Sequence, residues 1–570
     1  MTFRKFIKNK TKNTFVEPDE IFLDSENLQN FDRQQFEGRI EKPIPKKTIN
    51  FLGISFLLII LLFGVRLTNL QIQNGEAYKK RSENNILEKI NIFTERGIIY
   101  DRNKKELAWN EKKGLEFEFS SGSPIPATRA YLSSGFSHIL GYVSYPTKDN
   151  SGNYWQDEFI GKDGLEKKYN DQIKGENGSK IIEIDAKGMI HSENIINTPK
   201  QGSDLITSVD SRIQKIFFAS IKNLAENNSF VGGAGIIMDA RNGEIIASVS
   251  FPEYDSEILS LGKDSKKISS YMNDKRKFFL DRTISGLYTP GSVVKPFLGL
   301  GALAEGVIDS QKKILSTGSI SIPNPYFPDQ KTVFKDWRVN GWTNMAQALA
   351  VSSDIYFYAI GGGFEEQKGL GIEKINKYTT LFGIGETTGV DLPDEKGGIV
   401  PSPEWKLKNF KGDPWRVGDT YHTAIGQYGF QVTPIEIARA VSAIANYGTM
   451  LTPHLILEDK KMEERTRIID IKKEYFDIVH DGMRQAVTYG TAIVLNVPYV
   501  KVAAKTGTAQ LGVVKNKVNS WVIGFFPYEN PKYAFTVMME AGPSTGSANA
   551  SSAMRELLDW MSIHTPEYFK

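Results

Sequence analysis

The 570-residue sequence predicts an α+β protein that is anchored by a single N-terminal membrane helix. Three observations predict it: an uncharged apolar run at 49–65, strand-like alternation within 71–205, and strand patterns at both ends of 206–570 with helical patterns between them. Strands at both ends of a domain with helices between them indicate an antiparallel sheet covered by helices. The chain also exceeds the roughly 250–300 residues that one core supports, so several domains are expected.

The apolar run contains only two polar residues, Asn50 and Ser55. At about 1.5 Å per residue it is slightly shorter than the roughly 30 Å hydrocarbon core of a membrane, so we expect the anchor to extend over 49–70. A buried core helix and a cleavable signal peptide are the alternatives. The length disfavours the first, and the second lacks a small-x-small cleavage site after the run.

Charges around the anchor predict its orientation. Lys42, Lys46 and Lys47 precede the apolar run, and the positive-inside rule then places residues 1–48 in the cytoplasm and the rest on the other side of the membrane. Residues 1–48 are polar and mixed in charge, which predicts a disordered cytoplasmic tail. No later uncharged stretch reaches spanning length, so we expect a single-pass protein with a large extracytoplasmic part.

The composition excludes several classes of function. The chain has no cysteine, which excludes disulfides, thiolate catalysis and Cys-ligated metal. Its six histidines include no metal-ligand spacing such as H-E-x-x-H, so no metal and no other cofactor are expected. A net charge of +3, without a long basic run after the first residues, gives no reason to expect a nucleic-acid partner.

Two regions follow the anchor. Residues 71–205 alternate at 115–119 and are broken by turn clusters at 120–126 and 149–153, which predicts a β-rich membrane-proximal module. Residues 206–570 carry the longer helical patterns. The expected elements there are helices at 211–226 and 434–447, a hairpin of strands 235–239 and 244–250 around the turn 240–243, and a strand pair at 502–508 and 518–526.

Serine acyl transfer without a usable histidine needs another base, and a lysine one helical turn after the serine can supply it. Ser-x-x-Lys occurs three times, beginning at Ser260, Ser292 and Ser310. Ser260 leads into a sequence that predicts a solvated loop, and Ser310 precedes an expected exposed turn or helix start. Their sequence context therefore disfavours Ser260 and Ser310 as nucleophiles.

The context of Ser292 is different. It follows a Thr-Pro-Gly turn and precedes the apolar helical run 297–304. This places its hydroxyl at a helix N-terminus, where free N–H groups favour developing negative charge. Lys295 then lies one turn inside in an apolar setting, and desolvation lowers the pKa of a lysine. The simpler interpretation is a helix-capping serine followed by a surface lysine.

Two further motifs come later in the chain. Lys505-Thr506-Gly507-Thr508 contains the only Lys-Thr-Gly and follows a strand pattern. Glycine lets a ligand backbone approach the strand, and Lys505 offers a positive charge for a substrate carboxylate. A strand that ends in a turn is the simpler alternative.

Ser352-Ser353-Asp354 lies between these motifs. Ser-x-Asp or Ser-x-Asn also occurs elsewhere, so only its order in the chain is informative. The ordered set of Ser-x-x-Lys, Ser-x-Asn/Asp and Lys-Thr-Gly is typical of penicillin-binding proteins and β-lactamases.

Taken together, these motifs make the chain after residue 48 resemble the class B penicillin-binding proteins. Further stretches that carry the resemblance are 96–103, 129–131, 138–141, 161–166, 235–255, 281–295, 426–427 and 433–434. The resemblance implies a penicillin-binding/β-lactamase-like transpeptidase domain at 206–570 on a dimerisation-like pedestal at 71–205. Lys104 and Asn85 depart from the family pattern, which usually has Gly and Arg there, and this puts the pedestal's partner contacts in doubt.

The subgroup is indicated by Asp354, by the sequence 355–358 and by 382–405, which look like the elongation enzyme, penicillin-binding protein 2. Septal relatives usually have Asn in place of Asp354. The resemblance implies a bacterial enzyme of peptidoglycan synthesis and cell shape that is acylated by β-lactams. Its implied partners are peptidoglycan stem peptides, a polytopic glycan polymerase and other elongation-complex proteins.

The resemblance also implies roles for the motif residues. Lys295 takes the proton as Ser292 attacks the penultimate D-Ala carbonyl, and Ser352 relays it to the leaving amine. The backbone N–H groups of Ser292 and Thr508 form the oxyanion hole. Asp354 orients the substrate and the two lysines.

The terminal carboxylate of the stem peptide is expected on Lys505, Thr506 and Thr508, with Gly507 between them. A D,D-carboxypeptidase side activity is possible with the same residues. Three alternatives stay open: a β-lactamase or β-lactam sensor, which normally lacks a module such as 71–205, a septal-type transpeptidase, and a catalytically silent scaffold that regulates a glycan polymerase.

Overall fold

The computed structural model describes residues 45–79, 87–111, 127–132, 134–150, 154–184, 190–324, 326–327, 329–457, 466–512, 516–544 and 548–570. The chain forms two compact units, 1–87 and 88–570. Most of the predicted tail, the alternating stretch 115–119 and the turn cluster 120–126 lie outside the described residues, as does part of the cluster 149–153.

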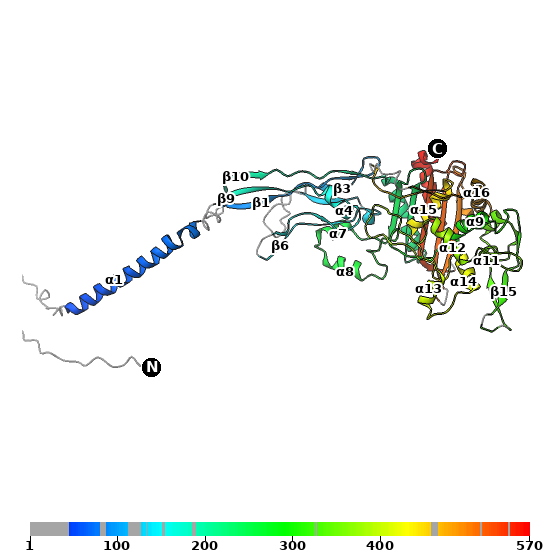
Figure 1. Cartoon of the computed structure of the whole chain (residues 1–570). Helices are drawn as coiled ribbons and strands as arrows, with labels where there is room; N and C mark the ends of the chain where they lie inside the picture. Colours follow the sequence, from blue (N-terminus) through cyan, green and yellow to red (C-terminus); the bar gives the residue numbers. More distant parts are fainter. Residues whose placement is uncertain are drawn as a thin grey trace, which may run out of the picture. The chain divides into compact units, whose positions relative to one another are not determined.

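The first unit is dominated by the helix α1 (Lys46–Thr68), the long blue helix of Figure 1. A π-helical turn, η4 (Asn69–Gln73), continues it. Among the described residues, Lys46–Gln73 is the one helix long and apolar enough to cross a membrane, and none of the residues of α1 is buried. At about 1.5 Å per residue, its 23 residues exceed the thickness of a hydrocarbon core.

The second unit begins with two small sheets. One has the order β1-β9-β10, and the other β11-β2-β3-β4. Their strands are β1 (Leu87–Ile92), β2 (Ile99–Tyr100), β3 (Glu106–Glu111), β4 (Thr128–Tyr131), β9 (Gly178–Ile184), β10 (Ile190–Asn197) and β11 (Leu205–Ile206). Short elements lie between them: α3 (Ser137–Leu140), β5 (Val143–Ser144), β6 (Thr147–Lys148), β7 (Tyr154–Gln156), β8 (Ile160–Gly161), α4 (Gly164–Lys168) and α5 (Asn170–Ile173). The described part of 71–205 is thus a mixture of short strands and helices.

Three sequence motifs of this region meet at a buried carboxylate. Glu166 Oε2 lies 2.5 Å from Arg96 Nε, and its Oε1 lies 2.8 Å from Arg129 Nε, with all three side chains almost fully buried. Burial opposes ionisation, but the charges of Arg129 and Arg96 outweigh it and lower the pKa of Glu166. Lys104 has φ +61°, a left-handed conformation that favours glycine and explains why Gly is usual at this turn.

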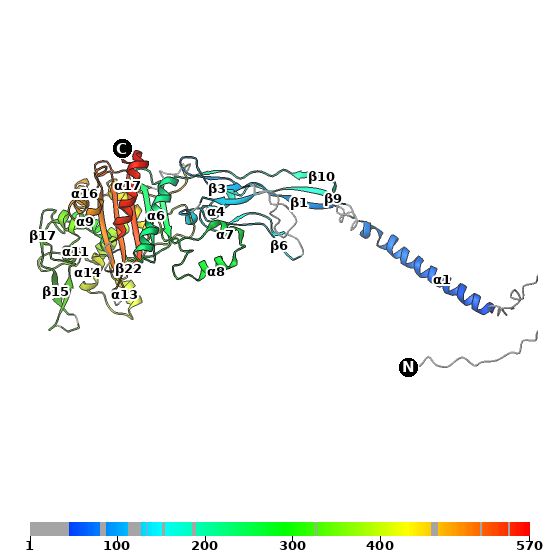
Figure 2. The same ribbon diagram turned by 180° about the vertical axis from the view of Figure 1, so that it is seen from behind.

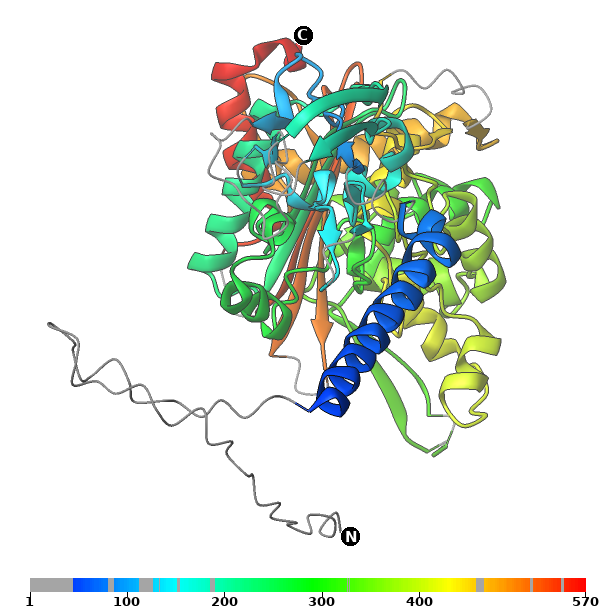
Figure 3. The ribbon, with the colours of Figure 1, turned by 90° about the vertical axis from the view of Figure 1, so that its left-hand side faces the viewer.

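The transpeptidase-like part is built on a five-stranded antiparallel sheet of order β13-β12-β22-β21-β20. Its strands are β12 (Gly232–Asp239), β13 (Ile245–Phe251), β20 (Ala503–Leu511), β21 (Lys517–Phe526) and β22 (Tyr533–Pro543). The predicted hairpin and the predicted strand pair are both confirmed. In Figure 3 the orange C-terminal strands run beside the green β12, which pairs with β22 along its full length.

Helices cover both faces of this sheet, as the sequence predicts. On one face α6 (Ser211–Asn227) and α17 (Ala550–His564) pack over apolar strand residues (Figure 2). On the other lie α9 (Lys295–Ala304), α15 (Pro434–Ala445) and α16 (Lys473–Thr488). The predicted helices 211–226 and 434–447 correspond to α6 and α15, although α15 ends two residues early.

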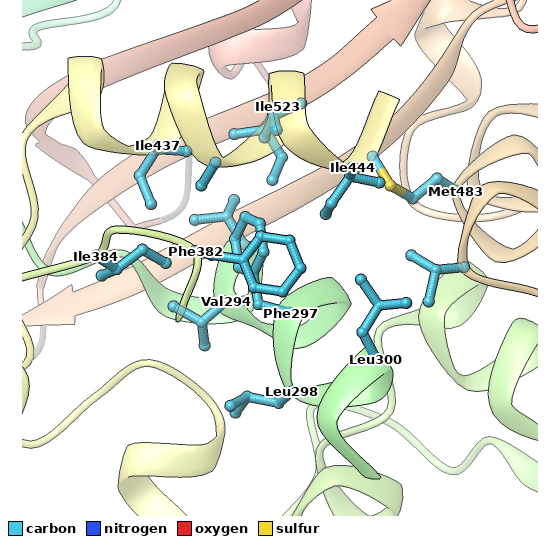
Figure 4. Close-up of a cluster of buried hydrophobic side chains, with 14 of the residues drawn as sticks. Val294, Phe297, Leu298, Leu300, Phe382, Ile384, Ile437, Ile444, Met483 and Ile523 are labelled. Carbon is cyan, nitrogen blue, oxygen red and sulfur yellow. The ribbon is translucent and has the colours of Figure 1, made fainter. Parts of the chain in front are cut away.

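The remaining elements complete the side of the sheet that carries α9. They are α10 (Met345–Val351), α11 (Asp354–Gly362), α12 (Gly371–Leu381), α13 (Pro403–Asn409) and α14 (Val417–Ala424), with small strand pairs β14 (Ile314–Ser316) and β17 (Gly341–Thr343), β15 (Ser319–Pro323) and β16 (Lys331–Lys335), and β18 (Thr449–Leu451) and β19 (Thr466–Ile468). Figure 4 shows how the start of α9 is held: Phe297 packs on Phe382 with ring centroids 5.2 Å apart, among buried aliphatic side chains.

One expectation about the local structure is only partly right. Ser260 leads into an exposed loop at 262–264, as predicted, but Ser260 itself is buried in α7 (Ser256–Leu261), where its Oγ accepts a hydrogen bond from Val143 N at 3.2 Å. Asp264 then caps a second helix, α8 (Ser265–Asn273). Ser310 does lie in a turn, as predicted. Lys263 and Lys313, the lysines that follow these two serines, are both exposed.

Candidate active site

Ser292 lies in the turn that leads into the central helix of the core. The 3₁₀-helix η5 (Gly291–Val294) runs directly into α9, so Ser292 is in the first turn of a helix, as the sequence predicts. It does not act as a helix cap, because Pro290 occupies that position and no side chain caps the turn. Ser292 is half-buried and lines a large cleft.

Lys295 is completely buried one turn further on, which excludes a surface lysine. Its Nζ donates to Ser352 O at 2.9 Å and lies 2.6 Å from Asp354 Oδ1, in an ion pair. It also lies 5.3 Å from the centroid of the Phe357 ring. The predicted apolar setting is therefore confirmed for α9, which packs in the core. It is wrong for the Lys295 ammonium group itself, which forms an ion pair with Asp354.

Ser352 connects two lysines. Its Oγ accepts a hydrogen bond from Lys505 Nζ at 2.8 Å and lies 3.4 Å from Lys295 Nζ. Ser352 ends α10 with φ +57° and ψ +40°, a left-handed conformation that is uncommon for a residue with a Cβ. Asp354 follows two residues later in the first turn of α11, where a helix N-terminus favours a negative charge.

Lys505 reaches this cluster from β20 and is also fully buried. Its Nζ donates to Ser352 Oγ and to Thr506 O, each at 2.8 Å. Burial and, next, the charge of Lys295 hold the pKa of Lys505 well below its ordinary value, whereas Asp354 acts in the opposite direction. Both buried lysines therefore lie within hydrogen-bond distance of the Ser352 hydroxyl, and the carboxylate of Asp354, which is bonded to Lys295, also acts on the charge of Lys505.

The two threonines of the Lys-Thr-Gly-Thr motif have different surroundings. Thr508 is exposed and lines the cleft together with Ser292. Thr506 is half-buried, and its Oγ1 donates to Thr491 Oγ1 at 2.6 Å, at a residue that follows α16. The structure thus places Thr508 in the cleft and Thr506 beside Thr491.

Glycines let β20 and the turn of η5 approach each other. A Cβ on Gly507 would lie only 2.8 Å from Pro290 O, and one on Gly291 would lie 3.1 Å from Thr508 O. A Cβ on Gly426 would lie 2.1 Å from Gly291 O. Because no side chain separates these backbones, the two residues predicted to supply the oxyanion hole, Ser292 and Thr508, border the same cleft.

The cleft has a volume of about 1170 Å³. Ser292, Asp354 and Thr508 lie on it together with Gln510, and two further walls come from the hairpin β15–β16 and from α13–α14. Sequence reasoning missed the residues of these walls, which include Asp336, Trp337, Lys406, Asp413, Arg416 and His422. No signal singles them out: the Asp-Trp pair at 336–337, for instance, recurs at 559–560.

Within the described ranges, no three His, Asp or Glu side chains come together as a metal site would require. Asp354, which lines the cleft together with Ser292, is grouped with Lys295, Ser352 and Lys505, and these residue types are those of acyl transfer through a serine nucleophile.

The sequence matches two protein families. The penicillin binding protein transpeptidase domain matches residues 233–559, and the penicillin-binding protein dimerisation domain matches residues 125–207. The peptidoglycan D,D-transpeptidase MrdA of Escherichia coli K12 is 29% identical over 613 residues, covering 89% of this chain and 93% of that protein.

Solved structures agree. PBP2 of Helicobacter pylori, in complex with MreC, has a TM-score of 0.68 and 28% identity, covering 84% of this chain and 99% of that one. PBP2 of Pseudomonas aeruginosa, in complex with WCK 5153, has a TM-score of 0.66 and 28% identity, covering 83% of this chain and 97% of that one. Since the transpeptidase match alone spans more than half of the sequence, the chain belongs to the penicillin-binding protein transpeptidases and is of the penicillin-binding protein 2 type.

Proposed function

We propose that the chain is a peptidoglycan D,D-transpeptidase that crosslinks stem peptides through an acyl-enzyme on Ser292 during cell-wall elongation. The observation that supports this most directly is the grouping of Lys295, Ser352, Asp354 and Lys505 beside one cleft that Ser292 borders. The substrate is a stem peptide that ends in D-Ala-D-Ala, and β-lactams acylate the same serine.

Acylation begins when Ser292 Oγ attacks the penultimate D-Ala carbonyl and Lys295 accepts its proton. The backbone N–H groups of Ser292 and Thr508 stabilise the oxyanion that forms, and such donors contribute about 3 kcal/mol each in other enzymes. Lys505 and Thr508 bind the terminal carboxylate from the cleft. Thr506 supports this site through its contact with Thr491, and Gly507 leaves room for the peptide backbone.

Lys295 can accept a proton only in its neutral form, and its Nζ lies in an ion pair with Asp354. Ser352 Oγ offers a path, because it lies between the two lysine nitrogens. A substrate carboxylate beside Lys505 favours a protonated Lys505, so the proton of Lys295 passes through Ser352 to Lys505 on binding. Ser352 then donates its proton to the leaving D-Ala amine and takes from Lys295 the proton that Lys295 accepted from Ser292.

The acyl-enzyme is resolved by the amine of a neighbouring stem peptide. This amine attacks the Ser292 ester, the C–O bond of the ester breaks, and the proton that the amine loses passes through Lys295 to Ser292 Oγ. The cleft walls from β15–β16 and α13–α14 leave space for a second peptide beside Ser292. Attack by water in place of the amine would give carboxypeptidase activity.

Labelling of the full-length protein with a fluorescent penicillin tests this proposal. The parent should be labelled and Ser292→Ala should not. Ser310→Ala is the matched control, since Ser310 also heads a Ser-x-x-Lys motif but lies in a turn, and it should be labelled like the parent. Labelling of Ser292→Ala would contradict the assigned nucleophile, and an unlabelled parent would favour a silent scaffold.

We also propose that the helix Lys46–Gln73 holds the enzyme in the cytoplasmic membrane, with residues 1–48 inside and a pedestal (71–205) and transpeptidase domain (206–570) outside. The length and composition of that helix and the lysines before it support this. PBP2 of H. pylori was solved with MreC, which supports a protein of that kind as a partner of this chain. The family resemblance adds other elongation-complex proteins and a polytopic glycan polymerase as expected partners. Protease added to spheroplasts should digest the catalytic part, and protection of that part would contradict the orientation.

A further inference from the structure

The strained turn between α10 and α11 is the least expected feature of the catalytic cluster. Ser352 has a left-handed backbone although it is not glycine, and its hydroxyl nevertheless lies within hydrogen-bond distance of both lysines. A residue with a Cβ keeps such a conformation only where the surrounding structure holds it. The contacts of this turn therefore decide where the Ser352 hydroxyl points.

Asp336 supplies most of these contacts from the segment between β16 and β17. Its Oδ1 accepts a hydrogen bond from Asp354 N at 3.0 Å, and its Oδ2 accepts from Ser353 Oγ at 2.8 Å and from Ile355 N at 3.3 Å. Asp354 N and Ile355 N are the first backbone donors of α11, which no carbonyl of the helix can satisfy. One carboxylate thus fixes the three residues that follow Ser352.

The same carboxylate is itself held in place. Ser316 Oγ in β14 donates to Asp336 Oδ2 at 2.9 Å, and Asn340 Nδ2 donates to it at 3.1 Å. The next residue, Trp337, contacts the other side of the turn, because its Nε1 donates to Val351 O at 3.1 Å, at the last residue of α10. Asp336 and Trp337 together hold the chain on both sides of Ser352.

We propose that Asp336 is a positioning residue for the transpeptidase reaction, which keeps Ser352 in its left-handed conformation with its hydroxyl between Lys295 and Lys505. Trp337 assists from the α10 side. Asp336 acts through Ser352 and Asp354 and does not contact the reacting atoms. The inference rests on the proposed function, because it assigns Asp336 to the same acyl-transfer site.

A purely structural cap would behave differently. Removing a cap lowers the stability of the fold and leaves the folded molecules as active as before. Removing a positioning residue lowers the limiting rate of acylation in the folded molecules and changes the affinity for the β-lactam little, because the carboxylate site on Lys505 and Thr508 remains. A misplacement of about 1 Å can lower a rate roughly 100-fold.

The test measures the dissociation constant and the limiting acylation rate of the full-length protein with a chromogenic or fluorescent β-lactam, beside its melting temperature. The variants are Asp336→Ala, the nearly isosteric Asp336→Asn, and Trp337→Phe. The matched control is Asp264→Ala, because Asp264 caps α8, and both α8 and α11 have nine residues. Asp264 is exposed and far in the sequence from every residue of the cluster.

We expect the limiting rate to fall roughly 10- to 100-fold in Asp336→Ala, less in Asp336→Asn, which keeps one acceptor oxygen, and least in Trp337→Phe. The dissociation constant should change by less than about 3-fold, and Asp264→Ala should acylate like the parent. Parental limiting rates per folded molecule in both Asp336 variants would overturn the inference while leaving the proposed function intact. A parent that is not acylated at all would instead overturn the proposed function.

Discussion

At the scale of single residues, the burial of Lys505 lowers the free energy of unfolding at neutral pH. Its pKa is lower in the folded chain than in the unfolded chain, mainly because of burial and next because of Lys295. The unfolded chain therefore binds more protons between the two pKa values, and the stability of the fold rises with pH there. The penalty is full at low pH and disappears as the pH rises towards about 10.4, the usual pKa of lysine.

Lys505→Met should therefore stabilise the protein at pH 7, by about 1 kcal/mol, while it abolishes acylation. The gain should shrink as the pH is raised to about 10, because the parent then loses its penalty. Urea unfolding of both proteins at several pH values measures this. A variant less stable than the parent at pH 7, or a gain independent of pH, would show that the burial of Lys505 does not destabilise the fold.

Asp354 is the carboxylate that pairs with Lys295 in the cluster. Asp354→Asn keeps a hydrogen-bond acceptor for Lys295 but removes the only carboxylate that is bonded to the lysine pair in the described structure. Acylation should fall moderately, roughly 10-fold, because the amide orients Lys295 less firmly than a charge-assisted bond. Stopped-flow acylation kinetics check this, and a rate equal to that of the parent would rule out the orienting role.

At the scale of elements, the contact of β20 with η5 brings Thr508 to the nucleophile turn. Gly507→Ala would place a Cβ 2.8 Å from Pro290 O and from Val293 Cγ1, so β20 has to move away from η5. We expect acylation to fall roughly 10-fold or more, with the sheet intact by circular dichroism. Gly512→Ala is the control on the same hairpin, because a Cβ there meets nothing within 4 Å, although its positive φ adds slight strain. Equal losses in both variants would contradict the account.

The elements that the sequence predicts best are those with a local pattern. The apolar anchor, the helix start at Ser292 and the strands around Lys505 follow from periodicity and Pro-Gly turns. The polar run after Ser260 correctly predicts an exposed loop at 262–264, but it does not reveal that Ser260 is buried or that Asp264 caps a new helix. Asp336 and Trp337 could not be found, because their role depends on contacts with residues 14 to 19 positions later.

At the scale of the whole molecule, residues 88–570 form one compact unit. A substitution far from the cleft should therefore lower the stability of the fold and leave the chemistry at Ser292 unchanged. Glu166→Gln leaves the buried Arg96 and Arg129 without their shared carboxylate. Breaking a buried charge pair destabilises by about 3–5 kcal/mol. Chemical unfolding should show this loss, with penicillin acylation unchanged per folded molecule at low temperature. Full stability would contradict a stabilising role for Glu166 between the two buried arginines.

The central claim is that Ser292 forms the acyl-enzyme, and peptide mapping tests it most directly. Full-length protein is treated with benzylpenicillin, digested with trypsin and analysed by tandem mass spectrometry. Trypsin does not cut before Pro296, so the peptide 283–312 carries both Ser292 and Ser310. We predict fragment ions that place the penicilloyl mass on Ser292 and leave Ser310 unmodified. An adduct on Ser310, on another residue, or on none would contradict the account.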